Sequence, residues 1–297
     1  MEEIYKSHTK TIVDKYKPYI NLMRPNQYIK NLFVLATLIF SQNIFEKVLV
    51  YKSLLAFICF CLISSAVYVI NDIVDIEKDK LHHKKCNRPL ASGAIKKNNA
   101  IVFAIMLISN SLIIGFFVNF KLIVIVLIYL INNLLYSFKI KNIVLLDVFS
   151  IAFGFILRVL AGSVSIGVNL SNWIILCTFF LSLYLGFGKR KKEIELLKNN
   201  ASDHRKILKD YTVEVIDQMM SVVLSGTIVC YALYSTSNPN KSNMIFTTIF
   251  VVYGIFRYNY LINITDEGNP TDVVLNDKNL QVNVVLWIIT CILILMS

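Results

Sequence analysis

The chain has 297 residues, of which 56% are hydrophobic and only 16% are charged. Soluble domains usually contain about a quarter charged residues and ~45–50% apolar residues, so this composition excludes an ordinary soluble protein. Apolar stretches of the ~17–25 residues needed to cross a hydrocarbon core recur along the whole length. The formal net charge is +11, which would suggest nucleic-acid binding in a soluble protein. In an integral membrane protein the basic loops explain that charge, and we expect no nucleic-acid partner.

We predict nine membrane crossings in a single domain of residues 1–297. Each crossing should be a helix, because a backbone in lipid must satisfy its own hydrogen bonds. The apolar runs are continuous rather than alternating, which excludes a β-barrel. The predicted spans are residues 31–50, 53–71, 98–117, 120–136, 143–162, 170–188, 213–234, 243–262 and 280–296.

The N-terminal segment 1–30 is polar and charged, without the apolar core of a cleaved signal peptide. Within it, residues 11–28 mix Ile and Tyr with Lys, as in an amphipathic helix lying at the membrane interface. With the N-terminus in the cytoplasm, the inner segments hold 24 Lys and Arg and the outer segments hold four. This bias predicts a cytoplasmic N-terminus, an outer C-terminus and a cytoplasmic site, in a bacterial plasma membrane.

Three aspartates at the end of the second span carry the strongest chemical signal. Asp72, Asp75 and Asp79 are spaced i, i+3 and i+7, so one face of a helix would present all three. Carboxylates beside an apolar span are costly unless a cation gathers them. Oxygen ligands without His or Cys favour Mg²⁺, with Mn²⁺ as the alternative. Because Mg²⁺ completes its shell with phosphate oxygens, a diphosphate is the expected ligand; the plainer interpretation is a solvated loop.

The run Asn71-Asp72-x-x-Asp75-x-x-x-Asp79 resembles the first aspartate-rich motif of the UbiA superfamily of membrane prenyltransferases. That resemblance implies an all-α bundle of nine transmembrane helices, whose cytoplasmic aspartates bind a diphosphate through Mg²⁺. Members that alkylate aromatic rings usually carry a second motif, DxxxD, between spans six and seven. Here that loop has the basic run 189–192 and lacks the DxxxD spacing. A site with one acidic and one basic pole suits two anionic substrates.

Several short segments resemble one branch of this superfamily, the polyprenyl-phosphate phosphoribosyltransferases. The resemblance implies transfer of a phosphoribosyl group from 5-phosphoribosyl diphosphate (PRPP) to a polyprenyl phosphate such as decaprenyl phosphate. The product would serve the synthesis of a cell-envelope polysaccharide precursor. The segments are 23–31, 87–93, 136–147, 154–162, 186–190 and 256–258.

On this hypothesis Asp72, Asp75 and Asp79 hold the metal and are catalytic together with Lys139 at the inner end of span four. The metal would offset charge on the departing diphosphate, and basic side chains would hold the other phosphates. Which cation serves which phosphate is left open. The predicted substrate-binding residues are Lys30, Asn71, Arg88, Tyr136, Asp147, Arg158, Lys189 and Arg190. Arg205, Tyr211 and Arg257 are weaker candidates.

Asp147 and Arg158 both lie in the fifth span, eleven residues or about 16 Å apart along a helix. That separation excludes a direct pair between them, so each needs a partner on another helix or in the site. For Arg158 a structural hydrogen-bonding role competes with a substrate role. For Tyr136 and Lys139, an interfacial aromatic belt and a snorkelling lysine are the plainer interpretation.

Other functions are open on the sequence alone. A prenyltransferase acting on an aromatic or quinone-precursor acceptor would use the same aspartates with a prenyl diphosphate. A transporter would line a pathway with charges such as Arg158, but no interrupted half-repeats are present. A structural scaffold would leave the three aspartates unexplained. The lipid bilayer is an expected partner, and a homo-oligomer is left open.

Overall fold

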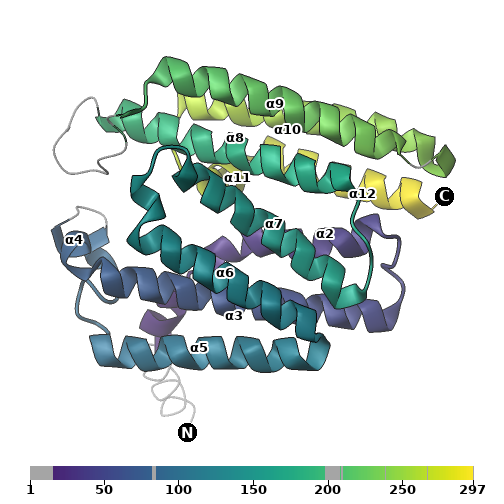
Figure 1. Ribbon diagram of the computed structural model, residues 1–297. Coiled ribbons are helices and arrows are strands. Elements are labelled where there is room, and N and C mark those ends of the chain that lie inside the picture. The colour runs from purple at the N-terminus through teal and green to yellow at the C-terminus, as the bar shows by residue number, and fades with distance from the viewer. Residues whose placement is uncertain are drawn as a thin grey trace, which may run out of the picture.

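In the computed structural model, the described residues are 16–81, 85–197, 208, 210–237, 239–265 and 267–296. Within them every regular element is a helix, and the helices lie alongside one another in one bundle (Figure 1). The long helices are α3 (Lys47–Val74), α5 (Lys97–Val118), α6 (Phe120–Phe138), α7 (Leu146–Ile166), α8 (Asn172–Leu197), α9 (Val213–Thr236), α10 (Thr248–Ile264) and α12 (Lys278–Met296). The short elements are η1 (Pro25–Leu32), α2 (Phe33–Phe40), α4 (Ile76–Leu81), η2 (Lys85–Asn87), η3 (Ile140–Asn142), η5 (Pro239–Thr247) and α11 (Pro270–Asn276).

Eight described helices are long and apolar enough to cross a membrane, with the last turn of η5 counted as part of α10. They correspond to the second through ninth predicted spans, which makes the chain a multi-pass membrane protein. The segment 16–23 is also helical, as the interfacial prediction requires, while residues 1–15 lie outside the described part.

The first predicted span, 31–50, is wrong as a single helix. The chain enters through η1 and α2, α2 ends at Phe40, and α3 begins only at Lys47. Between them Gln42 has a φ of 63°, and the Asn43 side chain donates to Ser41 Oγ at 2.9 Å. These polar side chains bond locally and interrupt the helix. A helix of eight residues is only about 12 Å long, so a ninth crossing depends on η1 and α2 together and stays a prediction.

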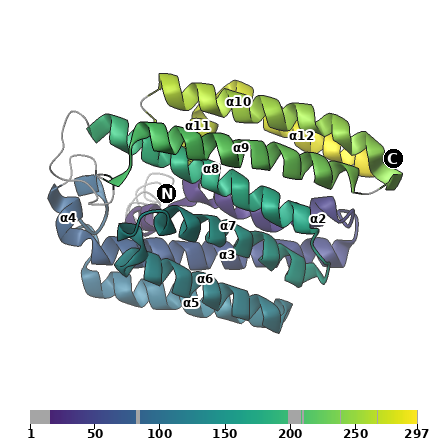
Figure 2. The same cartoon turned by 45° about the horizontal axis from the view of Figure 1, so that its top comes forward.

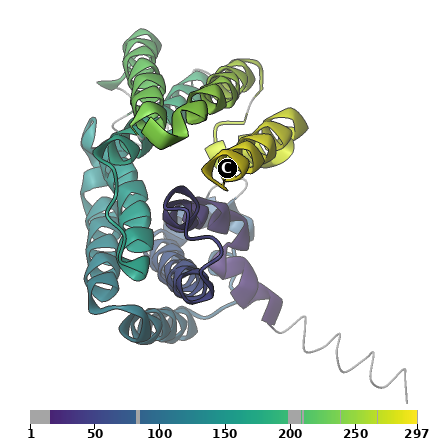
Figure 3. The same ribbon diagram turned by 90° about the vertical axis from the view of Figure 1, so that its right-hand side faces the viewer.

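The short helix α2 is seated by a very close approach to α7. A Cβ on Gly162 would lie 2.0 Å from the carbonyl oxygen of Val34, so only glycine permits this packing. The Thr37 hydroxyl also donates to the carbonyl oxygen of Val159 at 3.2 Å. Figure 3 looks along the bundle and shows an arc of helices from α5 through α9 and α10 to α12, with α2 and α3 on its inner side.

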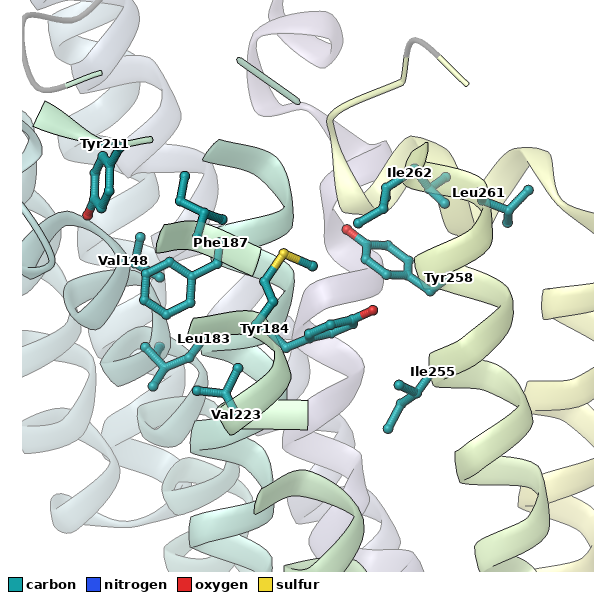
Figure 4. Close-up of a cluster of buried hydrophobic side chains, with 14 of the residues drawn as sticks. Val148, Leu183, Tyr184, Phe187, Tyr211, Val223, Ile255, Tyr258, Leu261 and Ile262 are labelled. Atoms are coloured by element: carbon teal, nitrogen blue, oxygen red, sulfur yellow. The ribbon is translucent and has the colours of Figure 1, made fainter. Parts of the chain in front are cut away.

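The largest buried cluster joins α7, α8, α9 and α10 (Figure 4). Tyr184 of α8 and Tyr258 of α10 meet edge to face with ring centroids 5.7 Å apart. Val148 of α7 packs so closely that a Cβ on Gly186 would lie 2.5 Å from its Cγ1 atom. This cluster fixes α8 beside α7, which brings the basic end of α8 next to the start of α7. Figures 1 and 2 show α4 at one end of the bundle and the C-terminus at the other.

Candidate active site

Two of the three predicted aspartates come together at the C-terminal end of α3. Asp72 lies in the last turn of α3 and is 2% exposed, and Asp79 lies in α4 and is 4% exposed. The helix is interrupted between them at Asp75, yet the amide of Asp79 still donates to the carbonyl of Asp75 at 2.8 Å. The seven-residue spacing therefore keeps Asp72 and Asp79 on one face. Asp75 is turned away toward η3, where Lys141 Nζ lies 3.4 Å from its Oδ1 atom.

Two arginines neutralise the buried pair. Nη1 of Arg88 lies 3.1 Å from Asp72 Oδ1 and 2.6 Å from Asp79 Oδ2. Arg24 also binds Asp72 Oδ1, and its guanidinium stacks over the ring of Tyr68 with 5.1 Å to the centroid. Arg24 has a φ of 55°, a left-handed conformation that non-glycine residues adopt mainly at constrained sites. Arg88 was predicted to hold a phosphate, and here it holds the aspartates.

The donor chemistry of this pair fits a hard divalent cation. Both groups offer only carboxylate oxygens, which Mg²⁺ prefers. A guanidinium nitrogen already lies between Asp72 Oδ1 and Asp79 Oδ2, so a positive charge is accommodated at that point. Across the described residues, no three His, Cys, Asp or Glu side chains converge as a metal-binding group. The structure thus brings two carboxylates together for a cation, and the role of Asp75 as a third ligand stays a prediction.

The C-terminal end of α6 contributes further residues to the site. Ser137 donates a hydrogen bond to the Oδ1 atom of Asn71, which fixes the side chain immediately before Asp72. Tyr136 accepts a hydrogen bond from Nη2 of Arg190 at 3.3 Å. Lys139 follows the last residue of α6 and is exposed. Of the residues predicted here, Asn71 and Tyr136 are held in defined positions, and Lys139 is available to a ligand from the aqueous side.

Arg190 and Asp147 form a buried ion pair between α8 and α7. Nε of Arg190 lies 2.6 Å from Asp147 Oδ2, and the two side chains are 1% and 0% exposed. Arg190 also pairs with Glu193, and Tyr211 donates to Asp147 Oδ1 at 3.2 Å. Burial raises the pKa of Tyr211 to about 12, so its hydroxyl remains a neutral donor. This geometry gives Arg190 and Asp147 a structural role, and their predicted contact with substrate stays a prediction.

Arg158 lies deeper in the bundle and is held by neutral groups. Its Nε, Nη1 and Nη2 atoms donate to Asn31 Oδ1 at 2.9 Å, the Gly154 carbonyl at 2.8 Å and the Tyr129 hydroxyl at 2.9 Å. It also stacks over the ring of Tyr129, with 4.9 Å to the centroid. The prediction that Arg158 and Asp147 find separate partners is confirmed. None of these three partners carries a negative charge, so Arg158 leaves a net positive charge inside the bundle.

Lys30 completes this inner cationic region. It is the residue before Asn31 in η1, and it is partly buried. Burial, followed by the positive charges of Lys189 and Arg158, lowers the pKa of Lys30 to about 7. The charges of Lys189 of α8 and Arg158 of α7 therefore reach Lys30, and a shared contact of the three with substrate stays a prediction. We call these three residues the inner cation group.

The family model for the UbiA prenyltransferase family matches residues 32–279. The chain belongs to the UbiA prenyltransferase family. Two curated relatives are named decaprenyl-phosphate phosphoribosyltransferase. That of Mycolicibacterium smegmatis is 31% identical, covering 91% of this chain and 89% of the relative. That of Corynebacterium glutamicum is 32% identical, covering 95% of this chain and 90% of the relative.

Among solved structures, a UbiA homolog from Archaeoglobus fulgidus bound to GPP and Mg²⁺ superposes with a TM-score of 0.69. The superposition covers 94% of this chain and all of that chain at 18% identity. It confirms the UbiA-type helical fold that the aspartate motif and the hydropathy pattern predicted.

Within this UbiA-family chain, sequence reasoning missed Arg24, Ser137 and Lys141. Arg24 lies in the segment 23–31 that was singled out, and its position before a proline was the available signal. Ser137 and Lys141 lie in the segment 136–147 that was also singled out, but their contacts with Asn71 and Asp75 join residues 66 positions apart and could not be predicted. Arg257 forms an ion pair with Asp277 on the α10–α12 side of the bundle. His82, His83, Lys84 and Arg205 lie outside the described residues.

Proposed function

We propose that this chain transfers the 5-phosphoribosyl group of PRPP to a polyprenyl phosphate, with Mg²⁺, and releases diphosphate. The observation that carries the proposal is the match to two decaprenyl-phosphate phosphoribosyltransferases at 31% and 32% identity over about nine tenths of each chain. The geometry agrees with two anionic substrates. A carboxylate pair lies at the inner end of α3, and the inner cation group is separate from it.

Asp72 and Asp79 would hold Mg²⁺ with the diphosphate of PRPP. The cation supplies neutralisation of the negative charge that grows on the leaving diphosphate. Arg24 and Arg88 already lie against these carboxylates, so their guanidinium groups would stay beside the diphosphate and bind its oxygens. Asn71, fixed by Ser137, is positioned to donate its amide N–H to an oxygen of the donor. Lys139 and Lys141 add positive charge on the aqueous side.

The reaction breaks the bond from ribose C1 to the diphosphate oxygen, and the electron pair leaves with the diphosphate. A phosphate oxygen of the acceptor then bonds to C1, which carries positive charge as in glycosyl transfer. The second pKa of a phosphate monoester is about 6, so at neutral pH the acceptor is already an anion. The site therefore needs no dedicated general base. Its role is to bind PRPP and the polyprenyl phosphate next to each other and to neutralise their negative charges.

We infer that the site opens to the cytoplasm and that the N-terminus lies on the same side. The distribution of Lys and Arg between the loops supports this orientation in a bacterial plasma membrane.

A second candidate is transfer of a prenyl group from a prenyl diphosphate to an aromatic acceptor. It is favoured by the likeness of the fold to the Archaeoglobus homolog that bound GPP and Mg²⁺. The same Asp72 and Asp79 would then hold the prenyl diphosphate. The basic run 189–192 argues against it, because that loop lacks the DxxxD spacing usual in members that alkylate aromatic rings.

The test uses purified protein in detergent with Mg²⁺, radiolabelled PRPP and polyprenyl phosphates of several chain lengths. Label should pass into the organic phase, and Asp72→Ala should abolish that transfer. Lys121→Met is the matched control, because Lys121 is an exposed cation at the opposite end of α6. Folded wild-type protein that transfers no label to any chain length would refute the proposal.

A further inference from the structure

The Arg24 side chain runs along α3 on its way to Asp72. Ser65 of α3 donates to the carbonyl oxygen of Met23 at 3.1 Å, which ties the chain just before Arg24 to this level of the helix. Asp72 lies seven residues further on, or about 10 Å along the helix. Tyr68 lies between these two levels, one turn before Asp72 and on the same face. The guanidinium of Arg24 covers the Tyr68 ring, with 5.1 Å from its Cζ atom to the ring centroid.

The two arginines at Asp72 are held differently. Nη1 of Arg88 lies against two carboxylates, at 3.1 Å from Asp72 and 2.6 Å from Asp79. Among the described residues, the guanidinium of Arg24 has one acceptor, Asp72 Oδ1, and its other named contact is the Tyr68 ring. A guanidinium carries five N–H donors in its plane, so most of those of Arg24 remain available at its edge. The Arg24 side chain is also 28% exposed, so a ligand can reach it.

An aromatic face holds an arginine without using its hydrogen-bond donors. The attraction comes from the negative face of the ring, whereas the N–H bonds lie in the guanidinium plane and point outward. Arg158 shows this arrangement in the same bundle. It lies over the ring of Phe155, with 5.2 Å to the centroid, and still donates hydrogen bonds to three neutral acceptors. The Tyr68 ring therefore holds Arg24 in a way that leaves the guanidinium edge free for a ligand.

We propose that Tyr68 is a positioning residue of the diphosphate site. Its ring holds the Arg24 guanidinium beside Asp72, and N–H groups along the guanidinium edge donate to oxygens of the diphosphate. The inference rests on the proposed function, in which the donor substrate brings that diphosphate. Tyr68 acts through Arg24, because a side chain already ordered against the ring loses less conformational freedom when the ligand binds.

The experiment measures binding of inorganic diphosphate, a group that both candidate donors contain. Isothermal titration of the full chain in detergent with Mg²⁺ should show a Kd about threefold to thirtyfold higher in Tyr68→Leu, the range for a partly desolvated cation–π contact. Tyr68→Phe keeps the ring and should stay within about twofold of the wild type. Tyr260→Leu is the matched control and should equal the wild type. The Tyr260 ring lies under Arg257 on the α10–α12 side of the bundle, with 5.6 Å to the centroid.

Two further measurements separate positioning from a purely structural role. In Arg24→Gln, adding Tyr68→Leu should weaken diphosphate binding no further, because the ring then has no guanidinium to hold. In the transfer reaction, Tyr68→Leu should raise the KM for PRPP by a similar factor to the Kd and leave the KM for the polyprenyl phosphate within about twofold. If Tyr68→Leu does not fold, para-cyanophenylalanine at this position decides, because it keeps the ring shape and weakens the negative face. Its Kd for diphosphate should exceed that of Tyr68→Phe.

Three results would overturn the assignment of Tyr68. The first is equal affinity of Tyr68→Leu and the wild type for diphosphate. The second is a loss from Tyr68→Leu that persists in full in the Arg24→Gln background. The third is a Tyr68→Phe variant that binds as weakly as Tyr68→Leu, since the hydroxyl rather than the ring would then set the affinity. The proposed function fails separately, when the wild type binds diphosphate with the expected dependence on Tyr68 but transfers no phosphoribosyl group to a polyprenyl phosphate.

Discussion

The buried pair of Arg190 and Asp147 should dominate the stability of the junction between α7 and α8. Among the described residues, replacing Arg190 with Met leaves the Asp147 carboxylate, 0% exposed, with the Tyr211 hydroxyl as its remaining side-chain partner. Removing one member of a buried ion pair typically costs about 3–5 kcal/mol, because the other charge stays buried without compensation. We therefore expect Arg190→Met to lower the free energy of unfolding by roughly that amount.

Asp147→Asn is the milder change. Arg190 keeps its pairing with Glu193, and an amide can still accept from Tyr211, so we expect a loss of about 1–3 kcal/mol. The double variant Asp147→Asn, Arg190→Met removes both charges and should be more stable than Arg190→Met alone. That non-additivity is the signature of a direct pair rather than of two independent side chains.

The assay is reversible unfolding in mixed detergent micelles, followed by far-UV circular dichroism, with Lys121→Met as the control. The double variant should also keep the KM for PRPP and for the acceptor within about threefold, a change worth less than ~0.7 kcal/mol. The reasoning is refuted if the single losses simply add. It is also refuted if the stable double variant shows a large rise in the KM for either substrate, since Arg190 would then be a phosphate ligand.

Three further outcomes follow from the charges of the site. Chelation with EDTA should abolish transfer, and Mg²⁺ should restore it. Asp72→Asn should raise the Mg²⁺ concentration needed for the half-maximal rate at least tenfold. An unchanged Mg²⁺ requirement in this variant would contradict the metal role of Asp72. Burial lowers the pKa of Lys30 to about 7, so Lys30 loses its charge above that pH; substrate affinity should fall there, and Lys30→Arg should remove this fall. The charged groups that act on Lys30 are Lys189, Arg158 and Arg24, which lower its pKa, and Asp272, which raises it. Asp272→Asn removes the negative charge that raises the Lys30 pKa, so the loss of substrate affinity should begin at lower pH. A shift of that loss to higher pH would refute the predicted role of Lys30.

The helices themselves were largely predictable. Hydropathy marks the apolar segments, and a backbone in lipid must satisfy its own hydrogen bonds as a helix. The exception at residues 31–50 is instructive. Ser41, Gln42 and Asn43 make the predicted span polar in its middle, but the sequence could not show that Gly162 lets α2 approach α7 closely enough to be held as a short helix. A span that is stabilised by contact rather than by length has little signature in hydropathy.

The charged contacts were predictable only where helix geometry restricted them. Asp147 and Arg158 lie eleven residues apart on one helix, which excluded a direct contact between them, and the structure gives them different partners. The partner of Asp147 was not predictable, because Arg190 lies 43 positions away and looked like a phosphate ligand in a basic run. The bridge that Arg88 makes between Asp72 and Asp79 was likewise not predictable, and its contact with a phosphate stays a prediction.

The central claim is that the reacting group is phosphoribosyl rather than prenyl. The most direct measurement offers one preparation of purified protein both reactions and identifies the lipid products by mass. One reaction contains PRPP with a polyprenyl phosphate, and the other contains a prenyl diphosphate with an aromatic acceptor. Our account predicts a lipid heavier by one phosphoribosyl group in the first and no product in the second. A prenylated aromatic product, with the polyprenyl phosphate unchanged, would contradict it.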